Sequence, residues 1–160
     1  MLNTDFTDLE NVLKTDIDFL EKIRAISDTI KVALKAERCT IFIHDPKTKT
    51  FWSAYIEGIS YVELPDDSGI VHEIYAQNQA QIINQVQANE DYNNSVEKNT
   101  GYFIHSMIAA PIIDNRKTPI GVIQIINKQT PDRYFSDADK EVVSNILHHI
   151  NEYTECLRGQ

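Results

Sequence analysis

The sequence predicts an α+β domain, in which a central, mostly antiparallel sheet of five to six strands has helices on both faces. Three observations predict this class. Apolar residues recur every three or four positions near both ends of the chain, which is typical of amphipathic helices. Alternating or continuous apolar runs lie between them, and short polar turns join these runs into hairpins. With 160 residues, the chain is long enough to bury one core.

The first predicted element is a long helix over residues 8–35, which no Pro or Gly interrupts. Its apolar stripe is narrow at first and broadens after Ile23, and a narrow stripe is typical of a helix that packs on a partner helix. We therefore predict a homodimer, with an N-terminal helical extension at residues 1–19 and a folded domain at residues 20–157. The stripe consists of Leu9, Leu13, Ile17, Leu20, Ile23, Ile26, Ile30 and Leu34.

Strands and a short helix follow in the first half of the domain. Residues 38–44 alternate between apolar and polar side chains, and the turn DPKTKT connects them to a second strand at 50–56. A short strand at 61–64 precedes a helix from about Gly69 to Asn78, for which Ser68 is placed as the cap. An extended piece at 80–84 completes this half.

The second half begins with a polar stretch, QANEDYNNSVEKNTG, whose length is typical of loops that bind something. The nearly all-apolar runs at 102–113 and 119–128 predict a central hairpin that is covered on both faces. A long C-terminal helix is predicted from Ser136 to the end.

The bulk composition argues against several function classes. A formal net charge of −9 opposes binding to nucleic acid or to an anionic membrane surface. No apolar run approaches the ~20 residues that a membrane span needs. The two cysteines, Cys39 and Cys156, form no CxxC pair, which fits a reducing compartment, so we expect a cytoplasmic protein.

Motifs of catalysis are missing from the sequence. It contains no GxSxG, P-loop, HExxH or glycine-rich dinucleotide turn. The five histidines do not form a ligand pattern, because His148 and His149 are adjacent on a helix and cannot both face one ion. We therefore expect no catalytic residue, no metal site and no enzymatic activity.

Four blocks of the sequence carry a family resemblance: RCTIFIHD, LPDDSGI, NTGY and PIGVIQIINK followed by FSDAD. Their order resembles that of GAF domains, the small-molecule sensor modules of phosphodiesterases, cyclases and bacterial signalling proteins, over roughly residues 20–155. The most specific element is the NKxnFxxxDE signature, which departs from the family at Lys140, where the family has Glu. Its matching residues are Asn127, Lys128, Phe135 and Asp139.

Two interpretations of this signature remain open. Ser136 and Asp139 already form an S-x-x-D capping box, which needs no further explanation. Capping does not account for Lys128 at the end of an apolar strand, and the resemblance implies that it forms a tie with Asp139. We expect that pair to support a pocket rather than to touch a ligand.

The resemblance places a ligand between the sheet and the cover formed by the middle helix and the long loop. Gln124 lies mid-strand on the face of Ile120, Val122 and Ile126, and a buried amide needs a partner, which a loop, a water or a bound base could provide. Contact positions of cyclic-nucleotide-binding members match Thr40, Ile70, Val71, Glu97, Thr100 and Gln124.

Three departures weaken the match to cyclic nucleotide. Ile104 replaces the second threonine of the loop, Asn93 aligns with its tyrosine, and Gln124 replaces a glutamate. Cys39 precedes any bilin attachment loop, and haem ligation through His72 or His105 is a remote alternative. Cyclic nucleotide remains a candidate, whereas the ligand and any cofactor stay unknown.

Two functions are therefore weighed. The first is a regulatory small-molecule-sensing domain of a bacterial-type signalling protein, which transmits its ligand state through the terminal helices of a dimer. The alternative is a ligand-free dimerisation scaffold for an attached output domain. Convergence of Gln124 and Thr40 with Thr100 on a cavity would favour sensing, whereas filling of that space by Phe42, Ile104 and Met107 would favour the scaffold.

Overall fold

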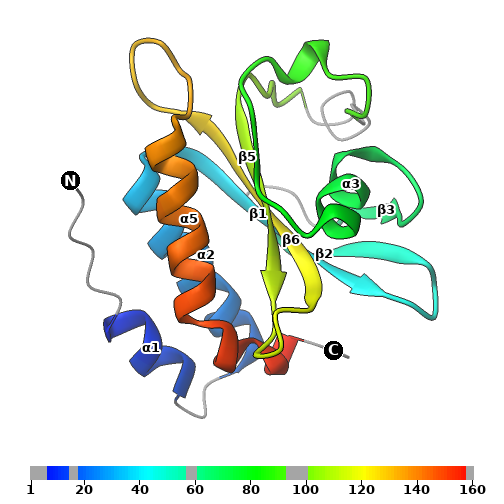
Figure 1. The fold of residues 1–160 in the computed structure, drawn as a ribbon, viewed down its shortest axis with the longest axis vertical. Coiled ribbons are helices and arrows are strands. Elements are labelled where there is room, and N and C mark those ends of the chain that lie inside the picture. The colour runs from blue at the N-terminus through cyan, green and yellow to red at the C-terminus, as the bar shows by residue number, and fades with distance from the viewer. Residues whose placement is uncertain (1–6, 15–17, 57–60, 93–100, 158–160) are drawn as a thin grey trace.

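The computed structural model describes residues 7–14, 18–56, 61–92 and 101–157 (Figure 1). Its six strands form one sheet of order β3-β2-β1-β6-β5-β4, in which every neighbouring pair is antiparallel. The predicted α+β class and the antiparallel sheet are thus confirmed. The elements are α1 (Thr7–Lys14), α2 (Phe19–Leu34), β1 (Ala36–Asp45), β2 (Thr50–Ile56), β3 (Glu63–Pro65), α3 (Gly69–Gln77), β4 (Gln81–Ile83), η1 (Val86–Ala88), β5 (Met107–Ile113), β6 (Pro119–Lys128), α5 (Asp137–His149) and η2 (Asn151–Leu157).

Helices cover both faces of the sheet, with α2 and α5 on one side and α3 on the other (Figure 1). Alternation along β1 divides the core in two, because Ile41 and Ile43 pack in the cluster beneath α2 and α5, and Phe42 packs in the cluster beneath α3. Ile120 was predicted to share the face of Val122 and lies instead in the α2/α5 cluster. A register shift of the β5–β6 ladder between Ile112 and Ile113 accompanies this change of face.

The N-terminal segment is two helices, so the predicted single long helix is wrong. Asp18 begins α2 as its N-cap, and its carboxylate accepts a hydrogen bond of 3.0 Å from the backbone N–H of Glu21. Leu9 and Leu13 of α1 are only 3% and 4% exposed, because α1 packs against α2 and η2 of the same chain. Leu9 and Leu13 of the narrow stripe that suggested a partner helix are therefore covered within one molecule, whereas Leu20 is 51% exposed.

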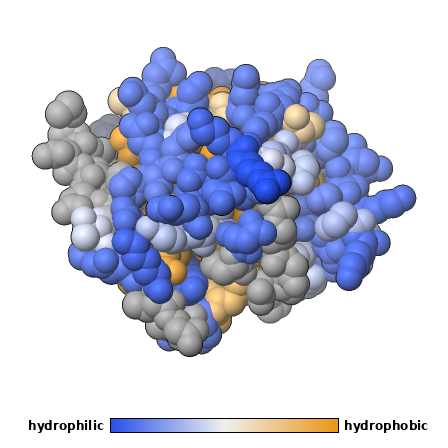
Figure 2. All heavy atoms as spheres, turned by 60° about the horizontal axis from the view of Figure 1, so that its bottom comes forward, coloured by the Kyte–Doolittle hydropathy of each residue, from blue (hydrophilic) through white to orange (hydrophobic). Residues whose placement is uncertain are grey.

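The C-terminal segment also differs from the prediction, because α5 ends at His149 and the chain continues as the 3₁₀ helix η2. The hydroxyl of Thr154 in η2 donates to the carbonyl of Ile113 at 2.7 Å, which ties the end of the described chain to β5. Figure 2 shows the surface at this end, which is largely hydrophilic, with hydrophobic residues only in small separate areas. None of the described helices combines the length and hydropathy that crossing a bilayer requires.

Strand pairing is close at the centre of the sheet and short at one edge. Where β1 meets β6, Gly121 lies so close to β1 that a Cβ atom on it would be 2.3 Å from the carbonyl oxygen of Phe42. At the β4 edge, β4 pairs only with residues 107–109 of β5. Among the described residues, the rest of β5 has no strand partner on that side.

Candidate functional site

The signature residues meet where β6 ends. The ammonium group of Lys128 donates to Asp139 Oδ1 at 3.0 Å and to the Leu34 carbonyl of α2 at 2.8 Å, and it lies 5.8 Å from the centre of the Phe135 ring. The side chains of Lys128 and Asp139 are only 11% and 12% exposed. The predicted tie between strand and helix is present.

The capping box is present as well, and Asp139 serves both purposes with different oxygens. Its Oδ2 accepts from the Ser136 backbone N–H at 2.9 Å, while the Ser136 hydroxyl accepts from the Asp139 N–H at 3.1 Å. Oδ1 remains for Lys128. The two interpretations drawn from the sequence are therefore both correct.

Asn127 anchors the segment that leads into β5. Its backbone adopts a left-handed conformation, with φ of 61°, and its side chain is buried. Oδ1 accepts from the backbone N–H of His105 at 2.7 Å, and Nδ2 donates to the carbonyl of Phe103 at 2.9 Å. A further N–H, that of Ser106, lies 3.3 Å from Oδ1. One amide thus fixes the backbone of residues 103–106.

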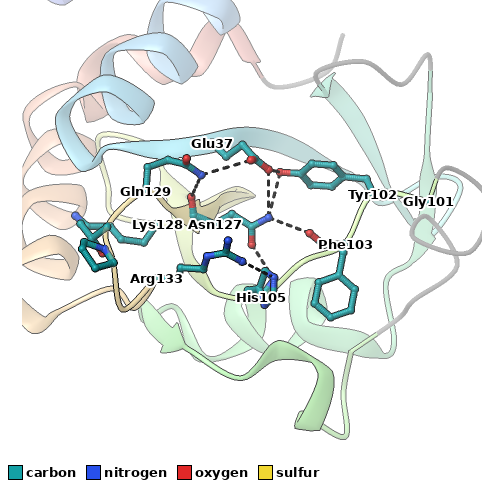
Figure 3. Close-up of a pocket in the computed structure, with 11 residues that line it drawn as sticks. Glu37, Gly101, Tyr102, Phe103, His105, Asn127, Lys128, Gln129 and Arg133 are labelled. Atoms are coloured by element: carbon teal, nitrogen blue, oxygen red, sulfur yellow. Dashed lines mark hydrogen bonds between the residues drawn. The ribbon is translucent and has the colours of Figure 1, made fainter.

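A cavity of about 620 Å³ opens beside these residues, at the end of β6 (Figure 3). Its size falls within the range of small-molecule sites. We call it the β6-end pocket, and its lining consists of Glu37, Gly101, Tyr102, Phe103, His105, Asn127, Lys128, Gln129, Thr130, Pro131 and Arg133.

Glu37 and Tyr102, which are joined by a hydrogen bond, form one wall of the β6-end pocket. The Tyr102 hydroxyl donates to Glu37 Oε1, and this bond is the main reason that the pKa of Glu37 lies below its ordinary value. Burial, followed by the neighbouring Glu37 carboxylate, raises the pKa of Tyr102. The guanidinium of Arg38 lies 3.9 Å from the centre of the Tyr102 ring, which fixes the ring from its other side.

A cationic and aromatic wall faces this pair (Figure 3). Arg133 Nη1 lies 3.0 Å from His105 Nε2, and because guanidinium can only donate, the ring nitrogen is the acceptor. The rings of Phe103 and His105 are 4.6 Å apart in edge-to-face geometry. The pocket thus offers a carboxylate, a guanidinium and an amide, which suits a polar molecule that both donates and accepts.

Two predicted ligand positions lie elsewhere, on the α3 face of the sheet. Thr40 on β1 lies directly opposite Gln124 on β6, and Gln124 in turn faces Ala109 on β5. Thr40 is 4% exposed and Gln124 is partly buried. Within the described part of the chain, neither side chain has a hydrogen-bond partner.

The remaining predicted positions offer few described polar groups to a ligand. Ile70 and Val71 bury their side chains beneath α3, so only their backbone N–H groups are available to a ligand. Ser68 begins α3, but contrary to the prediction its side chain makes no capping bond. Glu97, Thr100 and Asn93 lie outside the described residues. Ile104 is buried in the apolar cluster beneath α3.

Sequence reasoning did not identify most of the lining of the β6-end pocket, such as Glu37, Tyr102 and Arg133. Their partners are distant in sequence, and the only local signal was the position of polar residues at the ends of predicted strands. Across the described ranges, no group of three or more His, Cys, Asp or Glu side chains is arranged to hold a metal ion.

Comparisons with known proteins agree with this architecture. A curated relative, the dual 3′,5′-cyclic-AMP and -GMP phosphodiesterase 11A of Takifugu rubripes, is 24% identical over 157 residues, covering 89% of this chain and 17% of its own length. The chain therefore spans about a sixth of that relative.

Solved structures share the fold. The GAF domain of a phosphoenolpyruvate-protein phosphotransferase (ptsP) from Coxiella burnetii matches with a TM-score of 0.78 at 15% identity, over 94% of this chain and 90% of that one. The A. aeolicus nlh2 GAF domain in an inactive state matches with a TM-score of 0.65 at 24% identity, over 94% and 88%. The model of the GAF domain family matches residues 18–152, and the chain belongs to that family.

Proposed function

We propose that this chain is a regulatory domain of a bacterial-type signalling protein, which binds a small molecule on the α3 face of its sheet and itself performs no catalysis. GAF domains are small-molecule sensor and regulatory modules, so the coarse class follows from the family. The observation that carries the specific proposal is the Thr40–Gln124 pair.

These two polar side chains lie side by side on central strands, next to the apolar side chains of Phe42, Val122 and Ile126. Because their polar atoms have no partner among the described residues, these atoms are available to water or to a ligand. Their polar atoms are not sealed from solvent, because Ser27 Oγ is the one enclosed and unpartnered polar atom among the described side chains. Solvent therefore reaches the pair, and we propose that a ligand replaces it there.

Cyclic nucleotide is the first ligand to test. The name of the Takifugu relative records action on cyclic AMP and cyclic GMP. The amide of Gln124 can donate to and accept from a base, and the backbone N–H groups of Ile70 and Val71 at the start of α3 suit a phosphate, since Ser68 does not cap them. We include Glu97 and Thr100 in the proposed site on their match to family contact positions.

Lys128 supplies a physical route from the sheet to the helices on the opposite face. Its ammonium group bonds to the last turn of α2 and to the first turn of α5 at once. A ligand that favours one position of the β6 end would therefore bias how α2 and α5 pack. We propose that this bias, within a homodimer, is the signal.

The test is a thermal-shift series with cyclic AMP, cyclic GMP, other nucleotides and common metabolites. A ligand at 100 times its Kd should raise the midpoint by about 5–10 °C. Gln124→Leu should abolish that shift, and Gln129→Leu, on the β6-end pocket, serves as the matched control. A shift that Gln124→Leu leaves intact would move the site away from the Thr40–Gln124 pair.

A second candidate, the ligand-free dimerisation scaffold, is favoured by one observation. Phe42, Ile104 and Met107 are buried together in the apolar cluster beneath α3. A scaffold predicts no ligand response and a midpoint that rises with protein concentration. Light scattering across a concentration series, which reports molar mass, would separate the two functions.

A further inference from the structure

A second hollow of about 380 Å³ lies on the α5 side of the sheet, distant in the fold from the Thr40–Gln124 pair. We call it the basic groove. Its walls are one face of α5, the connection between α3 and β4, and the turn between β5 and β6. The lining consists of Asn78, Gln79, Ala80, Ala110, Pro111, Ile113, Lys117, Lys140, Ser144, Leu147 and His148.

The charge of this lining is opposite to that of the chain. The sequence has 24 acidic and 15 basic residues, yet Lys117, Lys140 and His148 line the groove without any Asp or Glu. Within the described ranges, none of these three side chains has an ion-pair or hydrogen-bond partner. Two lysine ammonium groups that line one hollow without a carboxylate favour an anion there.

The geometry of α5 places the polar groups in a row. Lys140, Ser144 and His148 are four residues apart, so they share one helix face and span about 12 Å. Leu147 and the β5 residues Ala110 and Pro111 form an apolar floor beside them.

Hydrogen bonds between side chains and backbone groups hold the opposite wall in place. Lys117 adopts a left-handed conformation, with φ of 62°, in a turn where Asp114 Oδ1 accepts from the N–H groups of Arg116 and Thr118, both at 2.9 Å. Asn78 Nδ2 donates to the Lys117 carbonyl at 3.1 Å, which joins this turn to the end of α3. Three hydrogen bonds thus hold the turn that carries Lys117, and one of them joins it to the end of α3.

We infer that the basic groove binds a phosphate ester of a small organic molecule, with the phosphate held by Lys117 and Lys140 and the organic part on the apolar floor, towards His148. A dianion matches the cations and the Ser144 hydroxyl donor, whereas the floor offers nothing to inorganic phosphate. Lys140 stands where the resemblance to the family implies Glu, so this chain carries a cation in the groove where a carboxylate is expected.

The test uses phenyl phosphate and inorganic phosphate as probes, titrated by calorimetry at constant ionic strength. Phenyl phosphate should bind saturably and more tightly than inorganic phosphate. Lys140→Glu should weaken it by about tenfold or more. Lys22→Glu is the matched control, because Lys22 occupies the same fourth position of α2 and is similarly exposed, and it should change affinity less than about twofold.

A second pair of variants tests the same inference if Lys140→Glu fails to fold. Lys117→Glu should weaken phenyl phosphate similarly, whereas Lys49→Glu, at a left-handed turn lysine in the β1–β2 hairpin, should not. Equal losses in groove and control variants, no saturation below about 10 mM, or equal affinity for both probes would each overturn the inference. Gln124→Leu should leave phenyl phosphate binding unchanged, so this test is independent of the proposed sensor site.

Discussion

Lys128 and Asp139 are eleven residues apart in sequence, and their charged groups lie 3.0 Å apart at the junction of β6 and α5. The same ammonium group also bonds to the Leu34 carbonyl, at the last turn of α2. One side chain thus holds three elements together, next to a pocket whose lining includes Lys128 itself. The contacts of this region and of the central sheet can be tested by substitution.

Replacing Lys128 with Met should destabilise the fold by about 3 kcal/mol, because it leaves the largely buried Asp139 carboxylate without its cation. Urea denaturation measures the loss, and Lys49→Met in the exposed β1–β2 turn should lie within about 0.5 kcal/mol of the wild type. A double-mutant cycle with Asp139→Asn should give a coupling above about 1 kcal/mol. A coupling near zero would show that Asp139 stabilises the fold only through its capping interactions with Ser136.

Asn127 combines a left-handed backbone with a bonded amide, and two substitutions separate these contributions. Asn127→Gly keeps the backbone conformation but leaves the His105 N–H and the Phe103 carbonyl unpaired, so it should cost about 2–3 kcal/mol. Asn127→Ala should cost about 1 kcal/mol more, because alanine resists positive φ. The measurement is chemical denaturation. Equal losses would mean that the backbone conformation relaxes freely.

Tyr102→Phe should change how stability depends on pH. The lowered pKa of Glu37 means that its interaction stabilises the fold above the unfolded-state pKa and is lost as pH falls through the folded value. The raised pKa of Tyr102 means that its contribution is lost as pH rises beyond about 10. The difference in stability between wild type and variant should therefore be largest from about pH 5 to 9 and shrink towards both extremes.

Thermal melts across this pH range measure the difference. Tyr134→Phe is the control, since the Tyr134 hydroxyl lies near the Gln85 amide and forms no described bond to a carboxylate. A Tyr102→Phe difference that stays constant from pH 3 to 7, about the range in which a carboxylate titrates, would contradict the assignment to Glu37.

Gly121→Ala should destabilise the central sheet by about 3 kcal/mol, because the new methyl group would overlap the Phe42 carbonyl on β1. Hydrogen exchange should show the loss at the β1–β6 ladder first. Ala109→Gly on the neighbouring strand is the comparison, since it removes a methyl group from another buried position of the sheet and should cost about 1 kcal/mol. An alanine at position 121 without effect would mean that β1 and β6 separate at little cost.

Local patterns were sufficient to predict the strands and the middle helix, because alternation and turn residues act over a few positions. They failed at the N-terminus for an identifiable reason. The apolar stripe continues through residues 15–18, so periodicity alone predicted one helix, although Asp18 and Glu21 have the spacing of a helix start. The 3₁₀ geometry after His149 has no comparable sequence signal.

In the functional region, too, contacts between segments close in sequence were predictable and contacts between distant segments were not. The signature pair of Lys128 and Asp139 was predictable because strand end and helix start lie close in sequence. The Glu37–Tyr102 bond joins residues 65 positions apart, and the Arg133–His105 contact joins residues 28 positions apart. Such pairings depend on the order of strands in the sheet, which a single sequence does not specify.

The short pairing of β4 has a consequence for association between molecules. Strand edges with open N–H and C=O groups can template the addition of another chain, which leads to aggregation. Past Ala109, β5 would present such an edge among the described residues, but Pro111 interrupts it with a residue that has no N–H to donate. Pro111→Val would restore a continuous row of N–H donors. This proline therefore opposes the addition of another strand at the edge of the sheet.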